Sequence, residues 1–403
     1  MTAALDAFLE GHFVGQFRED NTGAVNFVYD DAAPATPLSL SLPRDRPATR
    51  SAAGHFLENF LPDHSATRAR MAEVYGSPSA NTFDLLAESG GDIAGGLVLV
   101  REGTGINTGE PELNPATERD IATRIAALKR DPDAWVPTDA PARFSLGGTQ
   151  GKFALALVDD DWYWSNATVP STHILKPARP SFRGLEQAET ASLRLANAVG
   201  LHAPMASVLA AKDQTAYLVE RFDRDTTRPV ATRIHAEDLA QASATSPDKK
   251  YDMTATQALT LLATVDRDSR LAHAFVEQLA FNTMLGNADA HAKNYSLLLR
   301  PSGITLSPLY DVVPVGLYPE YHQDLAMHIS GAKRPQTVGA DHWRKLATMA
   351  DLEPDEVLAL VTGIAVGIAE HADAAYEALA DDQRRFLREQ LVRNTEKLTA
   401  AAR

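Results

Sequence analysis

The first hundred residues alternate between apolar and polar side chains, which is typical of half-buried strands. Three stretches carry this pattern, at 25–29, 38–42 and 97–100. Residues 102–115 are then rich in Gly, Thr, Asn, Pro and Glu, a composition typical of a connector. The pattern therefore predicts a small α+β unit at the start of the chain.

A second block is also rich in expected strands and ends near residue 223. It opens with a short helix that carries apolar residues at 121, 125 and 128. From Leu185 to Val199 the apolar positions have helical spacing, and Gly200 after them is a common helix stop. Strands are predicted at 152–158, 172–176 and 217–222.

From residue 224 onward the apolar period is helical almost throughout. A polar loop from Gly286 to Asn294 and two short apolar strands, 296–299 and 304–306, interrupt it. Helices are predicted near 236–243, 254–264, 269–285, 340–350, 354–379 and 382–398. The pattern as a whole favours an α+β protein with three parts: an N-terminal subdomain at 1–105, a β-rich lobe at 116–223 and a helical lobe at 224–403.

Composition narrows the partners and the compartment. The 403 residues include 38 Lys and Arg against 53 Asp and Glu, a net charge of -15, which opposes direct capture of nucleic acid and favours a basic protein partner. No cysteine is present, so disulfides, thiolate metal sites and cysteine nucleophiles are excluded. The N-terminus lacks a basic signal region, and we expect no stretch that approaches the roughly 18 apolar residues of a membrane span. We therefore expect a cytoplasmic protein.

The polar loop at 286–294 carries the arrangement that phosphoryl transfer requires. It contains Asp289 and, five positions later, Asn294, and a second aspartate, Asp311, follows a pair of expected strands. Kinases need one carboxylate for the proton of the nucleophile, and an amide with a second carboxylate for magnesium. The alternative is that Asp289 and Asn294 cap turns and helix ends, as these residues often do in loops.

Two further features upstream fit a nucleotide. The glycine-rich stretch Ser145–Lys152 precedes a strand, and its backbone amides suit an anion, although most such turns are hairpins and the spacing is not that of a Walker A loop. Lys176 lies within an apolar strand, where its ammonium needs a partner such as a phosphate. Glu189 either holds that lysine or lies exposed on a helix. The glycines at 103–109 have the wrong spacing for a dinucleotide loop and are interpreted as a linker.

Together these motifs resemble the HipA family, serine/threonine kinases that act as toxins of type II toxin–antitoxin modules. The resemblance covers roughly residues 5–370 and is most specific in the 286–294 loop. The matching motifs are Ser-Leu-Gly-Gly-Thr-Gln-Gly-Lys at 145–152, Thr-His-Ile-Leu-Lys-Pro at 172–177, Val-Glu-Arg-Phe-Asp-Arg at 219–224, His-Ala-Glu-Asp-Leu at 235–239, Gly-Asn-Ala-Asp-Ala-His-Ala-Lys-Asn at 286–294 and Leu-Tyr-Asp-Val at 309–312.

The resemblance implies a bilobal protein-kinase-like fold with an extra N-terminal α+β subdomain and a mostly helical C-terminal lobe. It implies Asp289 as catalytic base, Asn294 and Asp311 as magnesium ligands, and Lys176 as a phosphate ligand of ATP. Ser145 matches a position that such kinases autophosphorylate, which ejects the loop and silences the enzyme. The remaining implied nucleotide contacts are Gly147, Gly148, Thr149, Gln150, Gly151 and Lys152 in the loop, Glu220, Arg221 and Phe222 in the adenine hinge, and His291, Ala292, Lys293 and Tyr310 at the phosphate end.

This sequence departs from the family and from ordinary kinases at two places. Gly151 stands where family members often carry an acidic residue, and Tyr310-Asp311-Val312 replaces the Asp-Phe-Gly magnesium motif, as in the family. The first departure puts the rigidity of the loop in question.

The family resemblance implies ATP and Mg²⁺ as cofactors and a small basic, HipB-like antitoxin as the partner through which the chain reaches DNA. A protein substrate such as an aminoacyl-tRNA synthetase is implied as well. Two alternatives remain open at this point: a catalytically idle scaffold that serves as corepressor, and a small-molecule kinase on the same fold.

Overall fold

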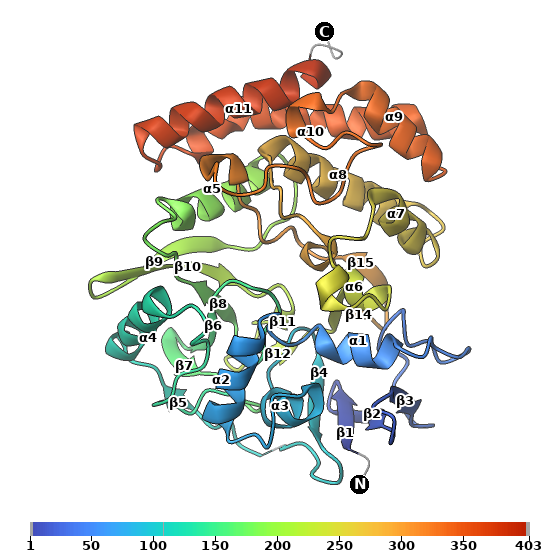
Figure 1. Cartoon of the computed structure of the whole chain (residues 1–403), viewed down its shortest axis with the longest axis vertical. Helices are drawn as coiled ribbons and strands as arrows, with labels where there is room; N and C mark the ends of the chain where they lie inside the picture. The colour runs from blue at the N-terminus through green and yellow to red at the C-terminus, as the bar shows by residue number, and fades with distance from the viewer. Residues whose placement is uncertain (1–2, 108, 400–403) are drawn as a thin grey trace. The chain divides into compact units, whose positions relative to one another are not determined.

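The structure is a computed structural model that describes residues 3–107 and 109–399. The chain forms two compact units, and its path is shown in Figure 1. Unit 1 comprises Met1–Pro180, Leu209–Asp248 and Leu297–Gly303, and unit 2 comprises Ser181–Val208, Lys249–Ser296 and Ile304–Arg403. Each unit is described by itself.

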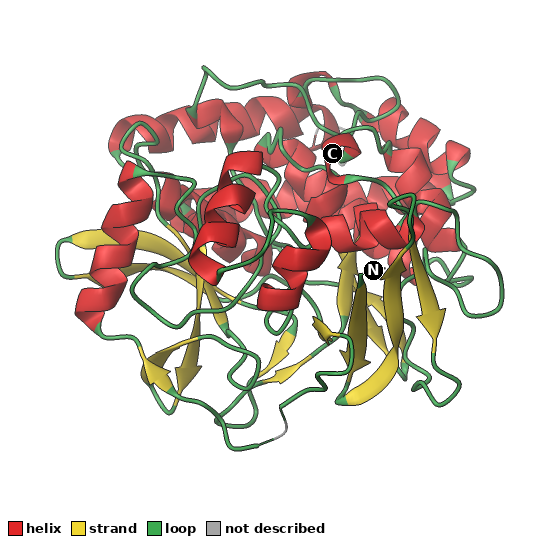
Figure 2. Ribbon diagram, turned by 60° about the horizontal axis from the view of Figure 1, so that its bottom comes forward, coloured by secondary structure: helices red, strands yellow, loops and turns green. Residues whose placement is uncertain are grey.

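Unit 1 begins with a four-stranded antiparallel sheet that lies beside the N-terminus in Figure 2. Its strand order is β3-β2-β1-β4, with β1 at Ala4–Leu9, β2 at His12–Glu19, β3 at Val25–Tyr29 and β4 at Leu97–Arg101. Three helices follow β3: α1 at Ala52–Glu58, α2 at Ser65–Tyr75 and α3 at Thr82–Ser89. Phe17 of β2 packs on Phe56 of α1 with ring centroids 6.0 Å apart, so the sheet and the helices share one apolar core.

The rest of unit 1 is built around a six-stranded sheet of order β5-β7-β6-β8-β10-β9. Helix α4 (Glu118–Arg130) starts at a capping box in which Thr117 and Asp120 bond to each other's backbone amides. The strands are β5 at Asn114–Pro115, β6 at Phe153–Val158, β7 at Asp161–Trp164, β8 at His173–Lys176, β9 at Ala206–Ala211 and β10 at Gln214–Glu220. Shorter elements follow: β11 at Arg224–Asp225, β12 at Thr232–Arg233, β13 at Ala236–Asp238 and α6 at Leu239–Ala242.

Unit 2 is mostly helical, and its helices are α5 at Leu185–Ala198, α7 at Ala255–Ala263, α8 at Arg270–Leu285, α9 at Ala340–Met349, α10 at Pro354–Ala375 and α11 at Asp381–Thr399. Strands β14 (Ser296–Arg300) and β15 (Gly303–Leu306) lie where the chain passes from unit 2 into unit 1 and back. α10 packs against α5, α8, α9 and α11, and it is the central helix of this unit.

Helix α10 corrects one expectation from the sequence. With 22 mostly apolar residues it is long and apolar enough to cross a membrane, so the expectation that no stretch approaches a membrane span is wrong here. A single helix of this kind is weak evidence for a span, because core helices share the composition. Its buried side chains form one stripe with helical spacing, which faces the helices of unit 2: Val357, Val361, Ile364, Ala365 and Ile368.

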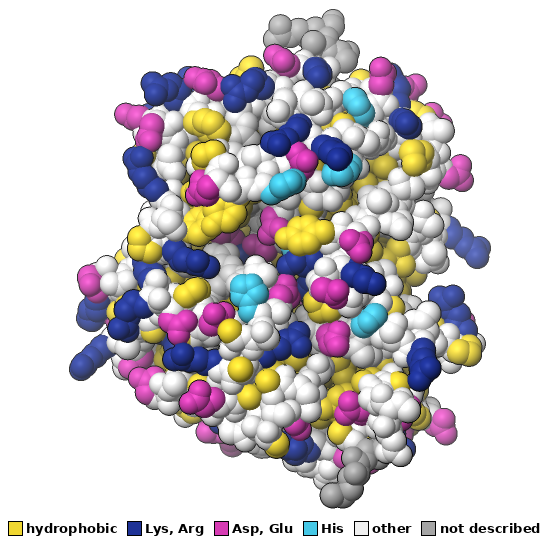
Figure 3. Space-filling view, viewed as in Figure 1, with side chains coloured by type: hydrophobic (Ala, Val, Ile, Leu, Met, Phe, Trp, Pro, Cys, Tyr) yellow, Lys and Arg dark blue, Asp and Glu magenta, His cyan; other side chains and the backbone are white. Residues whose placement is uncertain are grey.

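The face shown in Figure 3 carries side chains of both signs of charge. On the face in Figure 3, among the described residues that are coloured, dark blue Lys and Arg side chains lie between magenta Asp and Glu side chains and form no continuous basic area.

Most strands and helices expected from periodicity are confirmed, and three departures have physical causes. Residues 38–42 are not a strand, because buried side chains bind their backbone: Leu38 O lies 2.7 Å from His235 Nε2, and Leu40 N donates to Glu237 over 2.9 Å. Helices α1 to α3 lie within the predicted α+β unit, at positions where periodicity had located no helix. The helix expected at 236–243 begins instead as strand β13.

Glu237 provides a test of this packing. The carboxyl is buried and bonds to Ser39 Oγ and Leu40 N, and burial raises its pKa from 4.5 to about 8. Between pH 4.5 and about 8 the unfolded chain loses this proton and the folded chain keeps it. The contribution of Glu237 to the free energy of unfolding is therefore fully present below pH 4.5 and is lost as the pH rises toward 8. We expect Glu237→Gln to flatten this dependence. In the wild type the free energy of unfolding should fall by up to about 1.4 kcal/mol per pH unit in this range, and in the variant this fall should be absent.

Urea unfolding at pH 5 and pH 7.5 measures the effect, with Glu73→Gln on the exposed face of α2 as the matched control. Equal pH slopes for Glu237→Gln and the wild type would contradict the assignment of a protonated buried Glu237.

Candidate active site

The residues singled out from the sequence fall into two sets, one in each unit. Unit 1 holds Ser145, the loop at 147–152, Lys176 and the stretch at 220–222. Unit 2 holds Asp289, the turn at 291–294, Tyr310 and Asp311.

The loop in unit 2 starts where α8 ends. Gly286 caps the helix with φ of 73°, a left-handed conformation that favours glycine, and turns the chain out of the helix. Asn287 then connects three parts of the site. Its Nδ2 donates to Asn282 Oδ1 over 2.9 Å and to Asp311 O over 3.1 Å, and its Oδ1 accepts from Asp289 N over 3.4 Å. The side chain of Asn287 therefore positions both aspartates: it binds the main-chain amide of Asp289 and the main-chain carbonyl of Asp311.

Asp289 presents an exposed carboxylate beside the hydroxyl of Tyr251. Its Oδ1 accepts from Tyr251 OH over 2.5 Å, and the Tyr251 ring meets His291 edge-on at 4.9 Å. An accessible, oriented carboxylate is what a general base for a protein hydroxyl requires.

Asn294 and Asp311 lie together. Asn294 is buried, and its Nδ2 donates to Asp311 Oδ2 over 2.9 Å. Asp311 has φ of 58°, a left-handed conformation that is uncommon for a residue with a side chain and that holds the carboxylate against the loop.

This pair fits magnesium that arrives with a nucleotide. Carboxylate and amide oxygens are the ligands that Mg²⁺ takes from proteins, and it usually takes only one or two beside phosphates and water. Within residues 3–107 and 109–399, no cluster of three or more His, Asp or Glu side chains is placed to hold a metal by itself. The donor set therefore suits a metal–nucleotide complex better than an isolated ion.

Neighbouring side chains fix the turn that carries Asn294. Tyr310 OH donates to Lys293 O over 2.7 Å and lies 2.6 Å from Ser296 Oγ, which ties the strand after the loop to the 3₁₀ turn at Ala292–Asn294. Burial, with a smaller contribution from Lys250, lowers the pKa of His291 to about 3. His291 is therefore a neutral packing residue near neutral pH.

In unit 1 the glycine loop is folded back on itself. Gly148 has φ of +105°, a conformation that L side chains rarely adopt, and Lys152 Nζ donates to Gly147 O over 2.9 Å. A Cβ on Gly151 would lie 2.8 Å from Pro132 O, so no side chain fits there. Gly151, which stands where family members often carry an acidic residue, therefore lets the backbone pack closely against Pro132 and does not loosen the loop.

Lys176 and the expected hinge lie on neighbouring strands. Lys176 of β8 is buried opposite Tyr217 of β10, with its ammonium 5.5 Å from the Tyr217 ring centroid. Arg221 N donates to Thr172 O over 2.8 Å, so this amide is not available to a base. If the backbone of 220–222 binds adenine, as expected from the sequence, it must do so through groups other than the amide of Arg221.

Two further residues differ from the simplest expectation. Ser145 is 1% exposed, and its Oγ donates to Phe60 O over 2.8 Å, so the hydroxyl binds a carbonyl that is far away in the sequence. Glu189 of α5 is 1% exposed, so the alternative of an exposed helix glutamate is wrong.

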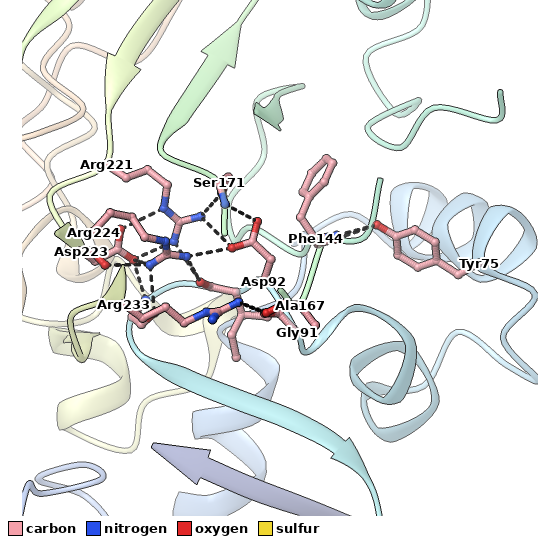
Figure 4. A network of polar contacts seen from close by, with 12 residues as sticks. Tyr75, Gly91, Asp92, Phe144, Ala167, Ser171, Arg221, Asp223, Arg224 and Arg233 are labelled. Carbon is pink, nitrogen blue, oxygen red and sulfur yellow. Dashed lines mark hydrogen bonds and ion pairs between the residues drawn. The ribbon is translucent and has the colours of Figure 1, made fainter. Parts of the chain in front are cut away.

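A buried polar network in unit 1 was not found from the sequence. Arg221 binds Asp223 through Nε at 2.9 Å and through a terminal nitrogen at 2.7 Å, and Arg224 binds Asp92 Oδ1 at 2.9 Å (Figure 4). Burial alone would raise the pKa of Asp223, but Arg221 and Arg224 outweigh burial and lower it. The motif at 219–224 contains four charged residues, yet Asp92, the partner of its two arginines, lies more than a hundred residues away in the sequence.

Comparisons with known proteins cover almost the whole chain. Family models described as the HipA N-terminal domain and the HipA-like C-terminal domain match residues 5–100 and 144–374. A relative from Sinorhizobium fredii, Y4mE, which carries the name of a kinase, is 32% identical over 94% of this chain and 93% of its own length. The serine/threonine-protein kinase toxin HipA of Shewanella oneidensis is 29% identical over 84% of this chain and 81% of its own.

A solved structure has the same fold. It is that of the toxin–antitoxin system HipA, HipB and operator DNA complex from Shewanella oneidensis MR-1. Its TM-score is 0.81 at 26% identity, and the match covers 98% of this chain and 97% of that one. This match confirms the α+β, protein-kinase-like fold class with an N-terminal subdomain that the sequence predicted.

Proposed function

Because the chain belongs to the HipA family of serine/threonine kinases, we propose that it is an ATP- and Mg²⁺-dependent protein kinase and the toxin of a type II toxin–antitoxin module. The observation that carries the proposal is the arrangement of Asp289, Asn294 and Asp311 around Asn287. By the family resemblance, the substrate is a component of translation such as an aminoacyl-tRNA synthetase.

Each residue takes a role that its surroundings support. Asp289, exposed and oriented by Tyr251, accepts the proton of the substrate hydroxyl. Asn294 and Asp311 hold Mg²⁺, which neutralises charge on the transferring phosphoryl group when it is bound. Lys176 binds the phosphates, the loop at 147–152 covers them, and the carbonyl groups of 220–222 contact the base. His291, Ala292, Lys293 and Tyr310 shape the phosphate end.

Our first prediction here concerns the two aspartates. We expect Asp289→Asn to lower kcat by about 10²–10⁴, the usual contribution of a general base, and Asp311→Asn to abolish phosphate transfer because a metal ligand is lost. The fold should survive both changes, since Asp289 is exposed and Asp311 is only partly buried. Transfer of labelled phosphate from ATP to the chain or to a protein substrate is the measurement.

Asp268→Asn is the matched control, because its side chain is 78% exposed in the same unit and lies outside the loop. Full activity of both active-site variants would exclude these roles. A wild-type protein that transfers no phosphate would favour the alternative of an idle corepressor scaffold, and phosphate found only on a metabolite would favour a small-molecule kinase.

The second prediction concerns autophosphorylation at Ser145. A phosphate adds about -1.5 to -2 charges and cannot donate the hydrogen bond that the hydroxyl makes to Phe60 O. Because Ser145 is buried, the modified loop must leave its place, and ATP affinity should fall. We expect Ser145→Ala to bind ATP and to lose this phosphorylation. Mass spectrometry after incubation with Mg-ATP decides the matter: turnover with phosphate on other residues and none on Ser145 would contradict the self-inhibition.

The third prediction concerns the partner. The solved relative is a complex of HipA with HipB and operator DNA, and this chain carries a net charge of -15, so we propose a small basic, HipB-like antitoxin through which the chain reaches DNA. We expect gel-shift assays to show tight DNA binding only when the product of a neighbouring antitoxin gene is present. The antitoxin alone is the control, and strong, salt-sensitive binding by the isolated chain would contradict the proposal.

A further inference from the structure

The start of the glycine loop is bound to residues of the N-terminal subdomain. Phe144, Ser145 and Gly148 make five hydrogen bonds to residues at 60–92, all within unit 1. They are Tyr75 OH to Phe144 O at 2.7 Å, Phe144 N to Tyr75 OH at 3.2 Å, Ser145 N to Asp92 O at 2.9 Å, Ser145 Oγ to Phe60 O at 2.8 Å and Asp63 N to Gly148 O at 3.0 Å.

Tyr75 both donates to and accepts from one residue of the loop. It is the last residue of α2, is 5% exposed, and has the guanidinium of Arg143 over its ring at 4.8 Å. Burial raises the pKa of its phenol, so the hydroxyl keeps the proton that it donates to Phe144 O. In Figure 4 the hydroxyl points at the backbone of Phe144. Tyr75 therefore satisfies both backbone groups of the residue that precedes Ser145.

Asp92 binds the loop with its main chain and the rest of the site with its side chain. Its carbonyl accepts from Ser145 N, while its carboxylate accepts from Arg224 at 2.9 Å and from Ser171 N at 3.2 Å. The carboxylate is buried between arginines, so the backbone of Asp92 has little freedom to move. One residue thus joins the glycine loop, the strand that leads to Lys176 and the segment after the hinge (Figure 4).

We propose that the N-terminal subdomain holds the glycine loop in its nucleotide-binding form, with Tyr75 and Asp92 as positioning residues for ATP. The inference rests on the proposed function, in which the loop at 147–152 covers the phosphates. It makes the domain matched at 5–100 a functional part of the nucleotide site, although the loop itself belongs to the domain matched at 144–374. Neither positioning residue touches the nucleotide, and both act through the backbone at 144–145.

The expected effect follows from the loop equilibrium. Apparent nucleotide affinity is proportional to the fraction of molecules whose loop is held in place, so it falls when that fraction falls. Tyr75→Phe removes two hydrogen bonds and leaves the amide and carbonyl of Phe144 unsatisfied when the loop is docked. We expect KM for ATP to rise about 10-fold with kcat unchanged at saturating ATP, since two bonds of ordinary strength are lost.

The test compares Tyr75→Phe with Tyr29→Phe, a matched control in the same subdomain whose hydroxyl donates to Leu42 O, away from the loop. KM and kcat for ATP are measured for both, together with hydrogen exchange of the nucleotide-free protein over residues 144–152. The proposal expects a higher KM and faster exchange in this stretch for Tyr75→Phe alone. Asp92→Asn, which weakens the contacts to Arg221 and Arg224, should shift the same two readouts in the same direction.

Equal behaviour of Tyr75→Phe and Tyr29→Phe would overturn the proposal, and so would a Tyr75→Phe enzyme with lowered kcat, unchanged KM and wild-type exchange at 144–152. Wild-type protein that binds no ATP would refute the kinase function and with it the role of Tyr75 in ATP binding. Hydrogen exchange over residues 144–152 needs no nucleotide. It therefore shows whether Tyr75 holds the loop in place even if the protein proves not to bind ATP.

Discussion

The interaction on which unit 1 depends is the buried ion cluster of Asp92, Arg221, Asp223 and Arg224. The two carboxylates are paired with the guanidinium groups of Arg221 and Arg224, which also donate to Ile93 O and Gly95 O, and the Arg233 guanidinium lies close enough to act on the cluster electrostatically. Removal of one member of such a cluster leaves a buried charge without compensation, at a typical cost of about 3–5 kcal/mol. The segment after β10 is therefore fixed to the end of the N-terminal subdomain, and the strand that carries Lys176 is fixed through Ser171.

In unit 2 uncharged groups have the same role. Asn287 bridges the loop and the Asp311 backbone, and the left-handed conformations of Gly286 and Asp311 bring the chain to it from both sides. A strained residue such as Asp311 persists only where its surroundings determine it, and here the amide of Asn294 and the amide of Asn287 supply that constraint. The geometry of the aspartates thus depends on two asparagine side chains that carry no charge.

The sequence predicted what local chemistry determines. The helix at Glu118–Arg130, the strand at Phe153–Val158 and the polar loop after α8 follow from periodicity, caps and a glycine stop, and all three are confirmed. Residues 38–42 alternate as a strand does, but their backbone partners are side chains almost two hundred positions away, which no local pattern encodes. Tyr75 and Asp92 were missed for the same reason, because an apolar helix end and a turn aspartate show no sign of distant partners. Asn287 lay inside the recognised loop, where its bridging role depends on the third dimension alone.

The free-energy difference between the docked and the released glycine loop is small enough for one covalent change to reverse it. Its five hydrogen bonds contribute about 0.5–1.5 kcal/mol each, and the cost of ordering the loop offsets most of this, so the docked form is favoured by only about 1 kcal/mol. A dianionic phosphate buried at Ser145 without a cation would cost several kcal/mol, which exceeds that preference. A serine at this buried position therefore allows one covalent change to invert the equilibrium, which an exposed serine on the same loop would not do.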